Sequence, residues 1–383
     1  MANKTENALT PVEQIALKSS PFKALYPPAE KIATIVVDNF PALGKLAAMR
    51  FIEWAQANPG GVISLPTGKT PEHFIKWVTH LLKSWDRPEA HAEMEKSGLD
   101  PAKRPDMRSL HFVQIDEFYP ISPSKHNSFF HYVNRYYVKG FGLDPKKALL
   151  IDCAKIGLPK GETLASVWPD SEVDLTLRYR AATSAQEEKQ TRALESIDQW
   201  CQDYEDQIRK LGGIGFFLGG IGPDGHIGFN VRGSDHHSTT RLTPTNYETQ
   251  AAAATDLGGI EIARKRLVIT IGLGTITFNP NCAAIIIAAG EAKAAVVASA
   301  IQSEKHALFP ATALHRLPNA RFYITLGAAQ RLAERQLHLV THAETLGDEA
   351  VERILVDLAV RKRKRLTDLD RDDFASDPLA AAL

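Results

Sequence analysis

The chain has 383 residues, of which 44% are hydrophobic and 23% are charged, and its formal net charge at pH 7 is zero. This composition is typical of a globular protein with a full core, arranged as one large domain or two ordinary ones. The zero net charge argues against general electrostatic binding to nucleic acid or to an anionic membrane surface.

Three scattered cysteines show no spacing typical of a disulfide framework or a metal site, which favours a reducing compartment. Residues 1–10 are polar and lack the apolar segment of a signal peptide. The longest apolar stretch, 282–290, is too short to span a bilayer. We therefore expect a cytoplasmic protein.

Neither His236-His237 nor the pair His126 and His131 has a third ligand at a suitable spacing, so no metal site is predicted.

Hydrophobic periodicity and turn residues predict strands that alternate with helices. The expected elements, in chain order, are one or two helices over 28–58, a strand over 60–65, a helix over 71–81, a strand over 111–115, a helix over 128–137, a strand over 149–151, a helix over 194–211, strands over 214–218, 267–271 and 284–288, a helix over 293–301 and a strand over 322–326. This alternation predicts an α/β fold, Rossmann-like, with a mostly parallel sheet and helices on both faces.

Composition shifts divide the chain into three parts. We expect an N-terminal arm over 1–28, a single α/β domain over 29–335 with insertions near 84–107 and 154–190, and a C-terminal helical extension and tail over 336–383. The basic run 361–365 is interpreted as a solvated helix end rather than a nucleic-acid site.

The most informative segment runs from Phe216 to Asn230, with the sequence FFLGGIGPDGHIGFN. A buried strand that ends in glycines and then presents Asp224 and His226 would give a titratable pair a rigid mount. Histidine can take and return a proton near neutral pH. The segment formally matches G-x-G-x-x-G, but Pro223 and the missing helix onset exclude a dinucleotide fingerprint.

Two further segments follow predicted strands. The sequence SLPTGKTP at 64–71 brings hydroxyls, a glycine and a helix start together, which favours phosphate binding, although an ordinary turn fits the segment too. Asp116 and Glu117 are adjacent acids at a strand end. They predict either a surface turn or a site in which one carboxylate acts as a base and the other is held by a supporting hydrogen bond.

Together, these segments resemble the glucosamine-6-phosphate deaminase family of sugar-phosphate isomerase type, which is related to 6-phosphogluconolactonase. Asn230 and the Asp-Glu-aromatic block favour the deaminase branch over the lactonase branch. The resemblance extends over about residues 30–330. It is carried by four blocks: 64–71, 115–119 with 127–130, 219–230, and 271–275 with 290–293.

The resemblance implies a mechanism and a site. His226, held by Asp224, would open the ring of an amino-sugar phosphate, and Asp116 would move a proton from carbon 2 to carbon 1. Water would replace the amine, so that fructose 6-phosphate and ammonia form with no metal or organic cofactor. The implied partner is a small-molecule sugar phosphate, with no nucleic acid or membrane, and a homo-oligomer stays open. The implied substrate and phosphate contacts are Thr67, Gly68, Lys69, Thr70, Glu117, Gly220, Asn230 and Lys293.

The chain departs from the family pattern at three places. Val231 stands where the family has the glutamate of an Asp-His-Glu triad. Thr255 stands where a phosphate-binding arginine is expected, with Arg264 or Arg266 as alternatives. Members regulated by N-acetylglucosamine 6-phosphate use a Ser, an Arg and a Lys, and the third position here is Thr243, which argues against that activation.

Ser234 and Arg241 match the first two of those regulatory positions.

Two other functions stay open beside the deaminase. The first is a lactonase-like hydrolase, with which the apolar residue at 231 is compatible. The second is a non-catalytic sugar-phosphate sensor, which would keep the phosphate loop and lose the triad.

Overall fold

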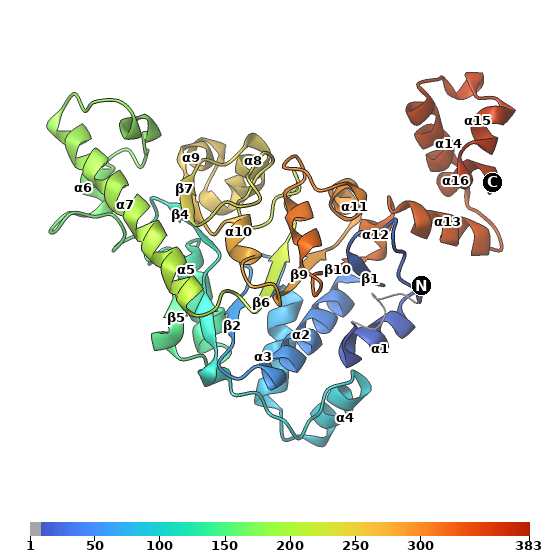
Figure 1. Cartoon of the computed structure of the whole chain (residues 1–383), viewed down its shortest axis with the longest axis horizontal. Helices are drawn as coiled ribbons and strands as arrows, with labels where there is room; N and C mark the ends of the chain where they lie inside the picture. Colours follow the sequence, from blue (N-terminus) through green and yellow to red (C-terminus); the bar gives the residue numbers. More distant parts are fainter. Residues whose placement is uncertain (1–8) are drawn as a thin grey trace.

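A seven-stranded parallel sheet lies at the centre of the computed structural model, which describes residues 9–383 (Figure 1). The strand order is β1-β10-β9-β6-β2-β3-β5. A second, antiparallel sheet has the order β4-β8-β7. The strands are β1 (Ala33–Val37), β2 (Val62–Ser64), β3 (His111–Val113), β4 (Asp116–Tyr119), β5 (Ala148–Leu149), β6 (Phe216–Gly220), β7 (Arg241–Thr243), β8 (Leu267–Thr270), β9 (Ala283–Ala288) and β10 (Arg321–Thr325).

Helices cover both faces of the large sheet, as expected for a parallel sheet. Side chains that alternate along one strand belong to two separate cores: Phe216 packs in the core that contains residues of α2 and α3, and Phe217 packs in the core with residues of α7 and α11. The helices are α1 (Pro11–Ser19), α2 (Phe40–Ala57), α3 (Glu72–Lys83), α4 (Pro88–Lys96), α5 (Phe129–Val133), α6 (Leu164–Val167), α7 (Ala185–Lys210), α8 (Tyr247–Leu257), α9 (Ile260–Lys265), α10 (Leu273–Ile276), α11 (Ala294–Gln302), α12 (Leu326–Ala329), α13 (Ala333–His342), α14 (Asp348–Lys362), α15 (Arg371–Ala375) and α16 (Pro378–Ala381). The predicted fold class is confirmed.

The structure corrects the expectation of helices alone over 28–58. Strand β1 occupies the first part of this range and pairs with β10, and α2 begins only at Phe40. Ile35 and Val36 are both fully buried, one in each core. A strand that is apolar on both faces has no alternation, so its periodicity does not distinguish it from a buried helix.

Two predicted strands also differ from the structure. The strand expected over 111–115 ends at Val113, and the chain then enters β4, where Asp116 pairs with Thr270 in antiparallel register. The strand expected over 267–271 is therefore β8 of the small sheet rather than part of the large one. The small sheet places Asp116 at the start of β4, beside the carboxyl edge of the large sheet.

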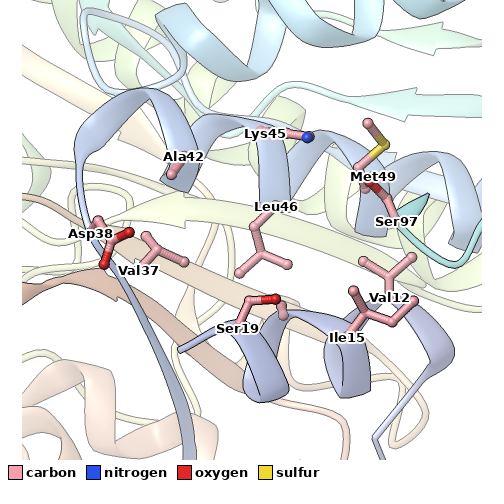
Figure 2. Close-up of a pocket in the computed structure, with 11 residues that line it drawn as sticks. Val12, Ile15, Ser19, Val37, Asp38, Ala42, Lys45, Leu46, Met49 and Ser97 are labelled. Carbon is pink, nitrogen blue, oxygen red and sulfur yellow. The ribbon is translucent and has the colours of Figure 1, made fainter. Parts of the chain in front are cut away.

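The predicted N-terminal arm is described only from Leu9, since residues 1–8 lie outside the described part of the chain. Helix α1 packs on α2 and is held by Glu13, which is 1% exposed and accepts a hydrogen bond of 2.7 Å from the hydroxyl of Tyr323. Arg321 pairs with the same carboxylate. Between α1 and α2 lies a mainly apolar cavity of about 200 Å³, in which Val12 and Ile15 face Leu46 and Met49 (Figure 2).

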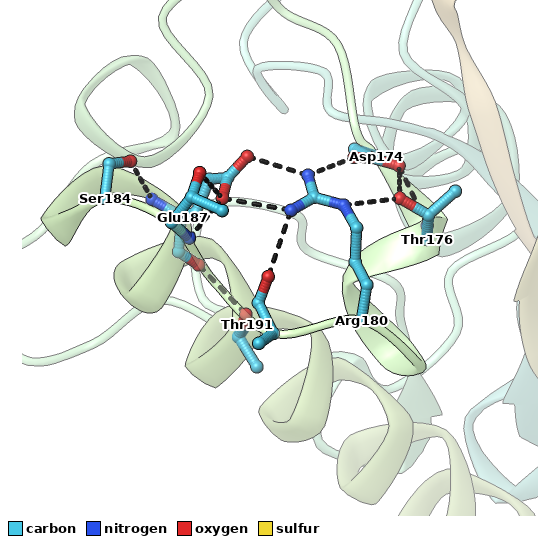
Figure 3. A network of polar contacts seen from close by, with 8 residues as sticks. Asp174, Thr176, Arg180, Ser184, Glu187 and Thr191 are labelled. Atoms are coloured by element: carbon cyan, nitrogen blue, oxygen red, sulfur yellow. Dashed lines mark hydrogen bonds and ion pairs between the residues drawn. The ribbon is translucent and has the colours of Figure 1, made fainter.

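The predicted insertion over 154–190 includes the beginning of α7, which starts at Ala185 rather than near 194 and extends away from the sheet (Figure 1). A network of polar side chains links the end of this insertion to the start of α7 (Figure 3). Arg180 donates to the carboxylates of Asp174 and Glu187, each over 2.7 Å, and to the hydroxyl of Thr176. These bonds hold the insertion against the first turn of α7.

Helices α13–α16 stand apart from the sheet (Figure 1). The last three of these helices enclose a small core of their own, which contains Ile354, Leu358 and Leu379. The basic run at the end of α14 pairs with the acidic tail, since Arg361 contacts Asp377 and Lys364 contacts Asp370 and Asp373. Much of the positive charge of the run is therefore neutralised within the chain.

Candidate active site

The carboxyl ends of β2, β3, β6 and β9 meet at one edge of the large sheet, where open α/β folds bind ligands. A cavity of about 250 Å³ opens at this edge. Its lining comes from the end of β6, the loops after these four strands, the start of β4 and α5. The lining residues are Pro66, Thr67, Thr70, Ile115, Asp116, Phe129, Gly219, Gly220, Ile221, Gly222, His226, Gly228, Phe229 and Lys293.

The loop after β2 contributes only part of the predicted phosphate contacts. Thr67 and Thr70 line the cavity, whereas Gly68 and Lys69 are exposed and do not. Gly68 has φ +83°, a conformation that suits glycine, and its carbonyl accepts a hydrogen bond from the hydroxyl of Tyr132. Helix α3 begins after Pro71 without a side-chain cap, and its first N–H group, that of Glu72, donates to the carbonyl of Lys69 over 3.2 Å.

Asp116 is 7% exposed and lines the cavity. Burial, followed by repulsion from the neighbouring Glu117 carboxylate, raises the pKa of Asp116 well above its ordinary value. A carboxylate with a raised pKa is a stronger base than an ordinary aspartate. Asp116 is therefore suited to take a proton from a carbon atom of a bound substrate.

Glu117 does not line the cavity, although the adjacent Asp116 does. Its carboxylate is fully buried and accepts hydrogen bonds from the hydroxyl of Ser128 (2.7 Å) and from the backbone N–H groups of Phe129 and Phe130 (3.0 and 2.7 Å). Burial nevertheless raises the pKa of Glu117 to about 7. Glu117 holds the start of α5, and with it Phe129, against β4.

Asp224 and His226 form a hydrogen-bonded pair in the loop after β6. The imidazole Nδ1 lies 2.5 Å from Asp224 Oδ1. Burial would raise the pKa of Asp224, but the hydrogen bond and the charge of His226 dominate and hold it well below the ordinary value. Because the ionised Asp224 carboxylate can only accept hydrogen bonds, the ring proton of His226 sits on Nδ1. The other ring nitrogen, Nε2, is then available to exchange a proton with a ligand.

Gly222 and Phe229 fix the position of the imidazole. A Cβ at residue 222 would lie 2.0 Å from Cε1 of His226, so only glycine allows this close approach. On its other side the ring stacks on Phe229, with 5.8 Å between ring centroids. The His226 ring is thus confined between a backbone and an aromatic face.

Two of the remaining predicted contacts line the cavity and one does not. Gly220 and Lys293 are lining residues, and Lys293 Nζ also donates to the carbonyl of Ile221 over 2.8 Å. Asn230 is fully buried, and its amide donates to the carbonyls of Ile227 and Ile271. Asn230 therefore joins the loop after β6 to the segment after β8, and its side chain does not line the cavity.

The sequence analysis missed two residues at this site. Asn246 donates from its amide nitrogen to Asp224 Oδ2 over 2.7 Å, and the hydroxyl of Thr249 lies 3.3 Å from Nδ1 of His226. Both belong to the first turn of α8 and its N-cap. A capping Asn before a helix was the only sequence signal, and it does not indicate which loop the helix contacts.

The positions that depart from the family pattern are also placed. Thr255 is exposed on α8, and Arg264 pairs with Glu261 on the surface of α9. Arg266 donates to the carbonyls of Pro120 and Ser171. None of the three residues discussed as phosphate ligands lines the cavity.

Arg241 and Ser234, the two residues that match the regulatory positions, lie together. One guanidinium nitrogen of Arg241 donates to Asn230 Oδ1 over 3.0 Å, and the other is 3.4 Å from the hydroxyl of Ser234. Among the described residues, which leave out 1–8 and the side chain of Asp256, no group of three or more His, Cys, Asp or Glu could hold a metal ion. No helix in this described part of the chain is long and apolar enough to cross a membrane.

Comparison with known proteins agrees with this fold. No family model matches the chain. The glucosamine-6-phosphate deaminase of Bacillus velezensis is 26% identical over 295 residues, covering 77% of this chain and 98% of that protein. Glucosamine-6-phosphate deaminase 2 of Bacillus subtilis is 25% identical over 299 residues, covering 78% and 96%. A solved monomeric glucosamine-6-phosphate deaminase has a TM-score of 0.56 and 21% identity, covering 78% of this chain and 99% of that one.

The chain therefore has the α/β fold that is found in a solved glucosamine-6-phosphate deaminase and in a solved 6-phosphogluconolactonase. In sequence, the chain is similar to glucosamine-6-phosphate deaminases at about 25% identity over most of its length. The 6-phosphogluconolactonase of Plasmodium vivax shares the fold, with a TM-score of 0.50 and 14% identity over 83% of this chain.

We predict that Glu117→Gln destabilises the protein in a pH-dependent way. Glutamine cannot accept all the hydrogen bonds that the carboxylate accepts, and an unpaired buried donor costs about 1–3 kcal/mol. Because the folded-state pKa of Glu117 is raised, the wild type itself loses stability as the pH rises through about 7. The loss caused by the substitution should therefore be largest below the ordinary glutamate pKa of 4.5, shrink as the pH rises toward 7 and change little above it, as measured by urea unfolding. The exposed Glu95→Gln is the control, and an equal, pH-independent loss in both variants would contradict the role of Glu117.

Proposed function

We propose that the chain is an amino-sugar-phosphate deaminase and isomerase. It converts glucosamine 6-phosphate, or a related hexosamine phosphate, and water to fructose 6-phosphate and ammonia. One observation carries this proposal: Asp116 and His226, which lie on loops far apart in the sequence, line the same cavity together with the cationic Lys293. The family likeness supports the same chemistry, since its curated members named above are glucosamine-6-phosphate deaminases.

In the proposed reaction, His226 first opens the sugar ring. Its Nε2 carries the proton between the ring oxygen and the hydroxyl at carbon 1, while Asp224 holds the proton on Nδ1. Asp116 then removes the proton at carbon 2 and returns it at carbon 1, through an enolamine. The resulting imine at carbon 2 adds water and expels ammonia, which leaves the ketone of fructose 6-phosphate.

The phosphate is expected at the end of the cavity formed by the loop after β2. Thr67 and Thr70 offer hydroxyl donors there, and the uncapped start of α3 offers backbone N–H groups. Lys293 supplies a positive charge from the loop after β9. Burial lowers the pKa of Lys293, while the nearby Asp224 raises it, so the carboxylate favours the charged ammonium.

The main test is turnover with purified protein. Incubation with glucosamine 6-phosphate should release ammonia and fructose 6-phosphate in equal amounts, measured by coupled enzyme assays. Val231, the apolar residue at the triad position, favours two alternatives that the same experiment separates. Hydrolysis of 6-phosphogluconolactone without ammonia release would indicate a lactonase. Binding of glucosamine 6-phosphate by calorimetry with neither turnover would indicate a sensor.

We predict that Asp116→Asn abolishes proton exchange at carbon 2. An amide cannot act as the base, and loss of such a group costs about 10²–10⁴-fold in rate. Exchange into deuterated water, followed by proton NMR, measures this step directly, and binding of the sugar phosphate should persist. Asp86→Asn, at a side chain that is 86% exposed, is the matched control. Wild-type exchange in Asp116→Asn would refute the assignment of the base.

We also predict an unusual pH dependence. The base must be ionised, so deamination should fall as the pH is lowered through the raised pKa of Asp116, well above the range of an ordinary aspartate near 4. Because Glu117 contributes to this raised pKa by repulsion, Glu117→Gln should move the acid limb of kcat/KM to lower pH. An acid limb that stays in place in this variant would show that Asp116 does not set it.

A further inference from the structure

The loop after β6 lacks the glutamate that the family places at residue 231, yet the Asp224–His226 pair is not left without support. The N-terminus of α8 lies against it. Asn246 Nδ2 donates to Asp224 Oδ2 over 2.7 Å, and the hydroxyl of Thr249 lies 3.3 Å from His226 Nδ1. Val231 has no side chain that could make either contact.

The orientation of the Asn246 amide is fixed by a second hydrogen bond. Its Oδ1 caps α8 by accepting the backbone N–H of Thr249 over 3.1 Å. The amide nitrogen must therefore point at Asp224, and it can only donate. Both oxygens of the ionised Asp224 carboxylate therefore accept hydrogen bonds. Oδ1 accepts from His226 Nδ1, and Oδ2 accepts from Asn246 and from the backbone N–H of Arg232.

Thr249 is 3% exposed, so its hydroxyl has little access to water. The Nδ1–H of His226 points mainly at Asp224, and the Thr249 oxygen accepts from the side. The Asp224 carboxylate accepts only, so it selects the tautomer with the proton on Nδ1, and in that tautomer the Thr249 oxygen is a second acceptor for the same N–H. That tautomer leaves Nε2 available at the cavity.

We propose that Asn246 and Thr249 are positioning residues for the Asp224–His226 pair, and that a neighbouring helix provides in this chain the support that a glutamate at 231 would give. This inference rests on the proposed function. The support consists of hydrogen bonds without a second negative charge. Two charged side chains line the cavity with His226: Lys293, whose Nζ donates to the carbonyl of Ile221, and Asp116 of β4.

The experiment separates positioning from helix capping at the same residue. Asn246→Ser keeps a good N-cap for α8 but is too short to reach Asp224. Asn246→Asp also caps, but it removes the donor and sets a like charge against Asp224. Thr249→Val removes only the hydroxyl from a side chain of nearly the same shape. Thr255→Val, at an exposed residue of the same helix, is the matched control.

Nitrogen NMR of the histidine rings measures the tautomer in the free protein, with the His226 signal identified by its loss in His226→Gln. Asn246→Ser and Thr249→Val should each increase the fraction of His226 that carries its proton on Nε2. They should also lower kcat for ammonia release by up to about a hundredfold, with a smaller change in KM, because misplacement of a catalytic group affects the reaction more than phosphate binding. Asn246→Asp should lose at least as much activity, and Thr255→Val should match the wild type.

Each result decides the proposal. A wild-type tautomer in both Asn246→Ser and Thr249→Val would overturn it, whether or not kcat falls. A shifted tautomer supports positioning even if the wild type releases no ammonia, in which case the proposed function fails and the positioning role stands. A fall in kcat confined to variants that lose α8 helicity by circular dichroism would indicate a capping role only.

Discussion

The pairing of β6 between β2 and β9 is the constraint on which the candidate site depends. These neighbours pair with the two edges of the strand, helices cover its two faces, and parallel pairing brings three loops to one edge of the sheet. The loop after β6 carries Asp224 and His226, the loop after β2 carries two threonines, and the loop after β9 carries Lys293. The small antiparallel sheet adds Asp116 from the side. A one-residue shift of β6 would exchange its two buried faces and remove the imidazole from the cavity.

Hydrogen bonds of buried polar side chains fix the backbone around this edge of the sheet. Glu117 accepts hydrogen bonds from the start of α5, and Asn230 donates to a backbone carbonyl beyond β8 and so fixes the end of the loop after β6. The two adjacent residues Asp116 and Glu117 differ in position: Asp116 lines the cavity, while Glu117 is buried in the core. The two carboxylates also repel each other, so the buried Glu117 contributes to the raised pKa of Asp116 at the cavity.

The sequence was sufficient to predict the α/β class and the strands that end at the site, because β6 and β9 are short apolar runs followed by glycine. It was insufficient for β1, where an apolar run buried on both faces lacks a distinguishing period. It was also insufficient to separate Glu117 and Asn230 from residues that line the cavity, because a motif specifies residue types and not the direction of their side chains. Asn246 could not be found, since its contact with Asp224 joins residues 22 positions apart through the packing of a separate helix.

The C-terminal helices have a consequence for how the chain responds to proteases. Their core of Ile354, Leu358, Leu379 and Ala380 is small, and exposed ion pairs on its surface add little free energy. Such a module opens locally at a much lower free energy than the sheet. Limited digestion would therefore cut after α13 first and leave a trimmed body with an intact cavity. The ease of that cleavage would rise with ionic strength, because salt screens the pairing between the basic helix end and the acidic tail.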